Sequence, residues 1–153
     1  MKEIFETYFS DIQKLMGCAS GIKCLVAIQT HNKKFLVVEE NGQAMAKIEK
    51  HQNSEIFEVI FISLDQLQFK GYHKKYLATG PGGTVYDYPN TSLLRRNWKA
   101  EYKGNDGFAF RSLYKQYYGK YLGAETNGAL NVKQSNAGLW QIFKVIKVKG
   151  KKA

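Results

Sequence analysis

At residues 120–125 the chain reads Lys120-Tyr121-Leu122-Gly123-Ala124-Glu125, and related stretches begin at Lys34 (Lys-Phe-Leu-Val-Val-Glu) and Lys75 (Lys-Tyr-Leu-Ala-Thr-Gly). The copies are spaced by 41 and 45 residues. A turn sequence follows each copy: Asn41-Gly42, Gly82-Gly83 and Asn127-Gly128. Asn-Gly and Gly-Gly suit the positive φ angles of two-residue hairpin turns. We therefore expect three structural repeats, each built around a β-hairpin.

Short apolar runs mark the strands of these repeats. They are rich in β-branched and aromatic residues and cover residues 25–28, 35–38, 57–62 and 142–146. Three copies of about four strands predict an all-β fold, a β-trefoil in which three hairpins cap a six-stranded barrel. Alternation along the strands predicts three inward-facing sets, which are Leu36, Leu77 and Leu122; Val38, Thr79 and Ala124; and Ala44, Val85 and Leu130.

The first residues follow a different period. Apolar residues recur at spacings of three and four over residues 3–16, and Gly17 ends the run, which predicts a short N-terminal amphipathic helix. The polar face of this helix is net acidic, which does not suit an anionic membrane. Packing on the domain body is therefore favoured over a membrane or a partner. The expected organisation is a helical extension at 1–17, a β-trefoil domain at 18–148 and a basic tail at 149–153.

Positive charge is in excess and unevenly distributed. Lys and Arg outnumber Asp and Glu by 23 to 13, which gives a formal net charge of +10. Residues 1–65 carry a net −2, residues 66–122 carry +7, residues 123–143 are neutral and residues 144–153 carry +5. Because 44% of the residues are hydrophobic, the composition excludes a disordered or fibrous protein. The charge favours a polyanionic partner.

Cys18 and Cys24 have a spacing that fits no common zinc site. Two cysteines also make no disulfide framework, so we expect free thiols in a reducing compartment. The first residues lack a secretory signal and a myristoylation glycine. No apolar run reaches the ~20 residues of a membrane span. These observations predict a cytoplasmic protein without a transmembrane segment.

One family resemblance covers about residues 22–148. The third copy, with residues 119–125, Asn127-Gly128 and the pair Trp140 and Phe143, resembles the fascin-type β-trefoil repeat. The resemblance implies a β-trefoil and, as partner, the actin filament at the cell cortex. Among such proteins the hisactophilins are single domains of about this size. This chain differs from them in having only three histidines and no N-terminal glycine for acylation. No actin-contact residue can be carried over.

Other motifs indicate structure rather than chemistry. His31 and His73 lack a paired carboxylate or nucleophile and are expected in surface loops. The stretch Gly80-Pro81-Gly82-Gly83 lacks the Gly-Lys-Ser/Thr of a phosphate loop and is expected to be a turn. Trp140 is assigned to the core, and Trp98 is left open. A ricin-type lectin is disfavoured because the Gln-x-Trp signature is absent. We expect no enzyme activity, cofactor or metal.

The predicted functional site is a basic patch that contacts filamentous actin through charge. Its members are Arg95, Arg96, Lys99, Lys103, Lys74, Lys75, Lys147, Lys149, Lys151 and Lys152. Lysines gathered on one face would give salt-sensitive docking on an acidic filament. RNA, DNA or an anionic phospholipid is the alternative partner of the same residues. Five tyrosines interleaved with them would offer base stacking if exposed, namely Tyr72, Tyr76, Tyr114, Tyr117 and Tyr118.

Overall fold

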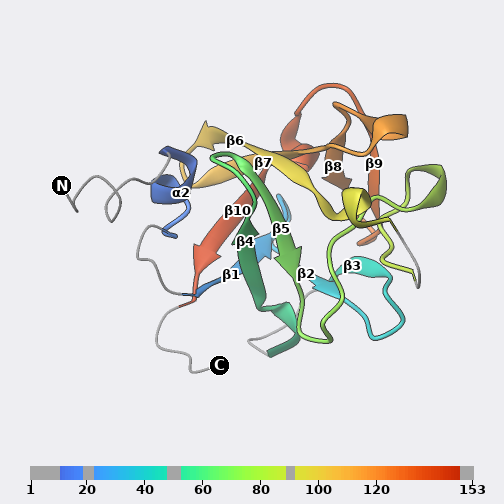
Figure 1. Cartoon of the computed structure of the whole chain (residues 1–153), viewed down its shortest axis with the longest axis horizontal. Helices are drawn as coiled ribbons and strands as arrows, with labels where there is room; N and C mark the ends of the chain where they lie inside the picture. Colours follow the sequence, from blue (N-terminus) through green and yellow to red (C-terminus); the bar gives the residue numbers. More distant parts are fainter. Residues whose placement is uncertain (1–10, 19–22, 48–52, 89–91, 149–153) are drawn as a thin grey trace.

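Six antiparallel strands close into a barrel in the computed structural model, which describes residues 11–18, 23–47, 53–88 and 92–148 (Figure 1). The strands among these residues are β1 (Cys24–Gln29), β2 (Phe35–Val38), β3 (Ala44–Lys47), β4 (Phe57–Phe61), β5 (Gln66–Lys70), β6 (Trp98–Gly104), β7 (Gly107–Ser112), β8 (Tyr121–Ala124), β9 (Leu130–Gln134) and β10 (Phe143–Lys147). Around the barrel the order is β1-β4-β5-β6-β7-β10, and β10 returns to pair with β1.

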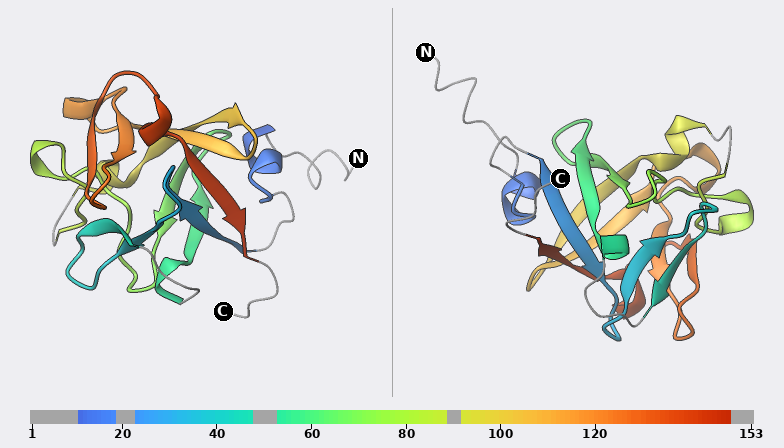
Figure 2. Two further views of the ribbon diagram at one scale, coloured as in Figure 1. Left: turned by 180° about the vertical axis from the view of Figure 1, so that it is seen from behind. Right: turned by 90° about the horizontal axis from the view of Figure 1, so that it is seen from below.

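The other four strands form two hairpins. β2 and β3 pair with each other and join β1 through Gln29 and Phe35, while β8 and β9 join β7 through Arg111 and Tyr121. Both hairpins lie on the side of the barrel away from the N-terminal helix (Figure 2). They touch there, because the amide of Ala46 donates a hydrogen bond of 2.8 Å to the carbonyl of Gly128.

Helical segments in the described residues are short. They are α2 (Asp11–Leu15) and the 3₁₀ turns η1 (Asn53–Glu55), η2 (Pro81–Gly83), η3 (Leu93–Arg96), η4 (Lys115–Tyr117) and η5 (Leu139–Gln141). α2 covers only the end of the helix predicted over 3–16, and residues 1–10 lie outside the described residues. Met16 is buried and Ile12 packs against the core. The described part of the helix therefore packs on the domain body, as predicted.

The all-β class is confirmed, but the β-trefoil prediction is wrong. Ten strands are present in the described residues, and they form a closed six-stranded barrel with four extra strands in two hairpins. Around Gly80-Pro81-Gly82-Gly83, where the third hairpin was predicted, only isolated bridges occur: Lys70 with Tyr76, Thr79 with Val85 and Gln43 with Tyr86.

The third hairpin is reduced to a single bridge, flanked by the bonds from the amide of Gly80 to the carbonyl of Thr84 at 2.7 Å and from the amide of Tyr86 to the carbonyl of Ala78 at 2.9 Å. The amide of Thr79 donates to the carbonyl of Arg95 at 2.8 Å, and the amide of Tyr76 donates to the carboxylate of Asp87 at 2.8 Å. The amide of Tyr76 is therefore not available to the facing segment, while the amide of Thr79 points away from Val85 and joins the bridge to η3. At the tip, Pro81 has no amide to donate, and the segment turns as η2. A regular ladder cannot form where its donors are used elsewhere.

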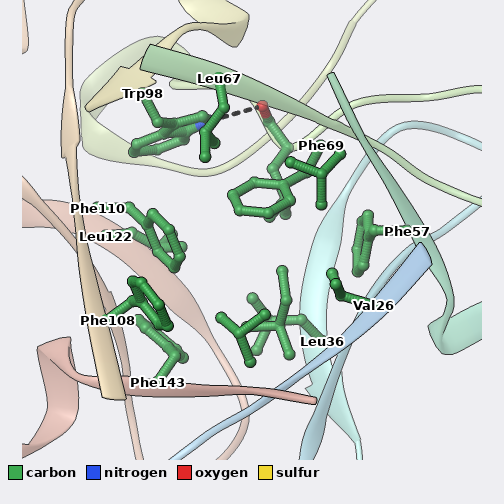
Figure 3. Packing of buried hydrophobic residues seen from close by; sticks show 14 of the residues in the cluster. Val26, Leu36, Phe57, Leu67, Phe69, Trp98, Phe108, Phe110, Leu122 and Phe143 are labelled. Atoms are coloured by element: carbon green, nitrogen blue, oxygen red, sulfur yellow. Dashed lines mark hydrogen bonds between the residues drawn. The ribbon is translucent and has the colours of Figure 1, made fainter. Parts of the chain in front are cut away.

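Aromatic side chains fill the barrel (Figure 3). Phe69 packs edge-on against Phe57 and Phe110, with ring centroids 6.1 and 5.0 Å apart, and Phe143 continues the cluster beyond Phe110. Trp98, which the sequence left open, is fully buried and donates from Nε1 to the carbonyl of Leu77 at 3.0 Å. Burial of each such side chain contributes roughly 1.5–3 kcal/mol.

The alternation of the strands placed the core residues correctly. All nine residues of the three predicted inward-facing sets are buried, including Thr79, whose hydroxyl lies 2.7 Å from that of Ser112. Trp140 differs in degree from its prediction: it is partly buried and packs against the core from outside. The register of the strands therefore follows the pattern of the sequence even though the topology departs from it.

A disulfide joins Cys18 to Cys24, so the prediction of free thiols is wrong. The two Cα atoms lie 5.3 Å apart, within the usual range for a disulfide. The bond ties the segment after α2 to the first residue of β1, where both cysteines are buried. The five residues between the two cysteines give a spacing that is typical of no common cysteine motif. The sequence therefore did not predict this pairing.

Candidate basic interaction surface

The two arginines of the predicted patch have partners inside the fold. Arg95 donates to the carbonyl of Thr79 at 2.9 Å and to the hydroxyl of Tyr114 at 3.1 Å, and its guanidinium lies 4.0 Å from the centroid of that ring. This arrangement fastens η3 to the segment that replaces the third hairpin. A role of Arg95 in partner contact stays a prediction.

Arg96 is held in a similar way by a buried carboxylate. Its Nε donates to Oδ1 of Asp87 at 3.0 Å, and its guanidinium lies 4.4 Å from the centroid of the Tyr76 ring. Asp87 is 1% exposed, and its carboxylate also accepts the backbone amide of Tyr76 at 2.8 Å. The positive charge of Arg96 is therefore largely neutralised within the molecule.

Lys99 and Lys103 lie on the outer face of β6 among alternating charges. Lys99 is 3.9 Å from Asp65, and Lys103 is 3.3 Å from Glu101. Arg111 of β7 faces Lys99 across the ladder and contacts Glu101 at 2.5 Å. This wall of the barrel, formed by β6 and β7, therefore has three cations that contact two acids, Asp65 and Glu101.

Glu101 is the centre of that wall. It accepts a hydrogen bond of 2.7 Å from the hydroxyl of Tyr121, which itself accepts one of 3.0 Å from Arg111. Burial raises the pKa of Glu101, but the bonds from Tyr121 and Lys103 and the charges of Arg111 and Lys103 outweigh it, so the pKa lies below its ordinary value. The pKa of Arg111 is raised, chiefly by the bond to Tyr121. Glu101 is therefore ionised at neutral pH.

Three turns close with the same pair of backbone hydrogen bonds. The bonds run between Thr30 and residues 33–34, between Gly71 and residues 74–75, and between Ser112 and residues 119–120. At the equivalent position these turns place Lys33 with φ 67°, Lys74 with φ 64° and Gly119 with φ 82°. Positive φ costs a lysine energy that glycine does not incur. Two of the three turns nevertheless present an exposed lysine there.

The remaining predicted lysines are less well placed to form one site. Lys75 follows Lys74 and is half-buried. Lys147 ends β10 opposite Val26, and its stem runs past Gly17, where an added Cβ would lie 3.6 Å from its Cδ. Lys149, Lys151 and Lys152 lie outside the described residues. The last described residue, Val148, lies beside the start of β1, where its amide donates to the carbonyl of Leu25 at 2.9 Å.

A basic hollow that the sequence did not reveal lies between three segments. Lys33, Lys103 and Lys144 line it together with His31, and its volume is about 380 Å³. Only Lys103 belonged to the predicted patch. The lysines come from distant parts of the chain, so no motif connects them. The one local signal is the alternation in β10, which buries Phe143 and exposes Lys144.

The predicted surface positions of His31 and His73 are confirmed, since both are exposed. The ring of His31 lies edge-on to Trp140 at 5.2 Å. Within the described residues, no group of three or more His, Cys, Asp or Glu side chains could hold a metal ion.

In the part of the chain that the structure describes, no helix has the length and apolar character needed to cross a membrane. Comparisons with known protein families and with curated proteins find no match for this sequence. The resemblance to fascin-type repeats therefore stays a proposal.

Proposed function

We propose that this protein is a non-enzymatic binding protein that docks on the acidic surface of actin filaments through exposed lysines. The two parts of this proposal, an acidic partner surface and actin as that partner, have separate support. The choice of an acidic surface rests on the charge and placement of the lysines, and the choice of actin rests on the likeness of the repeats to those of fascins. The proposed docking site includes Lys74 and Lys33, and Lys33 lines a hollow together with Lys103 of the barrel wall.

The observation that carries the proposal is the backbone of Lys33 and Lys74. Gly119 occupies the equivalent position of the third turn, so glycine fits this geometry. A lysine there costs stability, and strain of this kind persists where function requires the side chain. Neither ammonium has an ion-pair partner among the described residues. The two turns thus present charge that no described residue pairs.

The tyrosines favour a protein partner over a nucleic acid. Tyr76 and Tyr114 have guanidinium groups over their rings, and Tyr117 packs against the core. Tyr72 and Tyr118 are exposed. A stacking surface for single-stranded nucleic acid needs several open rings in succession. Three of the five candidate rings are occupied by other contacts.

Co-sedimentation with filamentous actin tests the proposal. The double variant Lys33→Gly and Lys74→Gly is expected to pellet roughly tenfold more weakly than the wild type at low salt, because two charge contacts are lost. The matched control, Lys115→Gln with Lys133→Gln, removes two charges from other exposed positions and is expected to pellet nearly as well as the wild type.

Two outcomes would overturn the proposal. One is no pelleting of the wild type at low salt, and the other is equal weakening by both double variants. A gel shift with single-stranded RNA, run on the same samples, addresses the alternative partner. Tighter binding to RNA than to filaments would assign the lysines to a nucleic acid instead.

A further inference from the structure

The basic hollow differs in its lining from two other hollows of the described surface, of which one has no charged lining residue and the other is lined by Glu125. It lies where the turn after β1, the β6–β7 turn and the segment from η5 into β10 meet. Its polar lining includes His31, Lys33, Lys103, Asn105 and Lys144, and none of its lining residues is acidic. A concave site that gathers three cations without a lining carboxylate points to an anionic ligand.

The barrel itself brings these lysines together. β10 lies between β1 and β7, with Lys144 opposite Gln29 on one side and opposite Gly107 on the other. Lys33 follows β1 in the chain, and Lys103 precedes the turn into β7. The two flanking lysines therefore approach Lys144 from opposite sides. Closure of the barrel by its last strand creates the site.

Nearby acids do not cancel this charge. Glu101 contacts Lys103 at 3.3 Å but also binds Arg111 and Tyr121, so it is shared among three partners. Asp106 lies in the β6–β7 turn beside Asn105, and its side chain is not part of the lining. Its backbone carbonyl accepts from the amide of Val145 at 3.3 Å. The hollow thus keeps a net positive charge.

The geometry points to a phosphate-bearing ligand rather than a carboxylate. A carboxylate offers two oxygens in one plane, whereas a terminal phosphate offers three oxygens that can accept from ammonium groups in different directions. The volume of about 380 Å³ lies within the range of small-molecule sites. Leu139 and Ile142 add apolar lining beside the cations.

We propose that the hollow between His31, Lys33, Lys103 and Lys144 binds a small anion bearing one or more phosphate groups. The inference goes beyond filament docking, because it concerns a compact ligand in a concave site. The phosphate belongs either to a free small molecule or to the headgroup of a lipid. Both sources present the same chemistry to the three lysines.

Titration of the full chain with inorganic pyrophosphate tests the site, with heat of binding and amide chemical shifts as readouts. We expect saturable binding with the largest shifts at Gly104, Gly107 and Lys144. Lys103→Gln and Lys144→Gln are each expected to weaken binding roughly tenfold, because each removes a charge-assisted hydrogen bond. Lys133→Gln removes the same charge from an exposed position outside the hollow and is expected to change affinity less than about twofold.

Equal weakening by Lys133→Gln, or shifts spread over the whole basic surface, would overturn the site and indicate attraction by net charge alone. Asp106→Asn gives an opposite test, because loss of a nearby negative charge is expected to tighten pyrophosphate binding. All four substitutions are at exposed positions, and circular dichroism checks that each variant is folded.

Vesicles of phosphatidylcholine with phosphatidic acid distinguish the two sources. Vesicle binding that pyrophosphate displaces and Lys144→Gln weakens would assign the ligand to a lipid headgroup. Pyrophosphate binding without vesicle binding would assign it to a free molecule. A chain that binds pyrophosphate but does not pellet with filaments would overturn the proposed function and leave this site standing. A chain that pellets with filaments but does not bind pyrophosphate would overturn this site and leave the proposed function standing.

Discussion

Arg96 donates a hydrogen bond of 3.0 Å to Asp87, whose carboxylate is buried to 1% exposure and also accepts the backbone amide of Tyr76. Asp87→Ala would leave the arginine and the amide without their partner. We expect a loss of about 3 kcal/mol in the free energy of unfolding, measured by urea denaturation.

Asp65→Ala is the matched control, because the Asp65–Lys99 pair is 3.9 Å apart and exposed. Its expected cost is below about 0.5 kcal/mol. Equal losses in the two variants would contradict the structural role of Asp87. A charge reversal at Arg96 would remove the same contact and would therefore lower stability.

Lys33→Gly and Lys74→Gly are each expected to stabilise the protein. Glycine adopts positive φ without the steric cost that lysine incurs, and the gain is about 1 kcal/mol after the greater entropy of the unfolded glycine is subtracted. Thermal unfolding measures it, and Gly119→Ala is expected to lose a similar amount. The predicted combination of higher stability and weaker filament binding separates function from folding.

The ionisation of Glu101 links stability to pH. Because its pKa is lower in the folded state than the ordinary value of 4.5, its contribution is present above that value and is lost as the pH falls through the folded pKa. Glu101→Gln is expected to unfold more easily at pH 7, by about 1 kcal/mol. Urea unfolding should show the difference from the wild type shrinking as the pH falls below about 4.5. A constant difference across that range would refute the linkage.

The disulfide between Cys18 and Cys24 closes a short loop. In the chain-entropy description such a loop contributes about 2 kcal/mol. Dithiothreitol is therefore expected to lower the melting temperature of the wild type and to leave that of Cys18→Ser with Cys24→Ser unchanged. An equal response of both proteins would show that the bond does not stabilise the fold.

The strands and the core could be predicted because they depend on local alternation. β2 was predicted at residues 35–38 and is observed there, and the buried faces followed from the same period. The topology around residues 76–87 could not be predicted, because the amides of Tyr76 and Thr79 bind groups that lie 11 and 16 residues further along. No local sequence pattern predicts hydrogen bonds between residues this far apart.

The candidate site was predicted less well for the same reason. Arg95 and Arg96 stood out as a cluster in the sequence, yet their guanidinium groups have internal partners. Lys33 and Lys144 were not part of the predicted patch, and the structure brings them to one hollow. Charge can be counted from a sequence, but which charges are already paired depends on tertiary contacts.

The pairing of β10 with both β1 and β7 has a consequence for biosynthesis. Until the last strand has left the ribosome, β1 and β7 each present an unpaired edge that can recruit strands from other chains. β1 can complete its pairing only after β10 has been synthesised. Contacts between residues so far apart in the sequence predict slow folding. A chain that stops before Phe143 would lack only β10. The barrel would nevertheless stay open, with the edges of both β1 and β7 exposed.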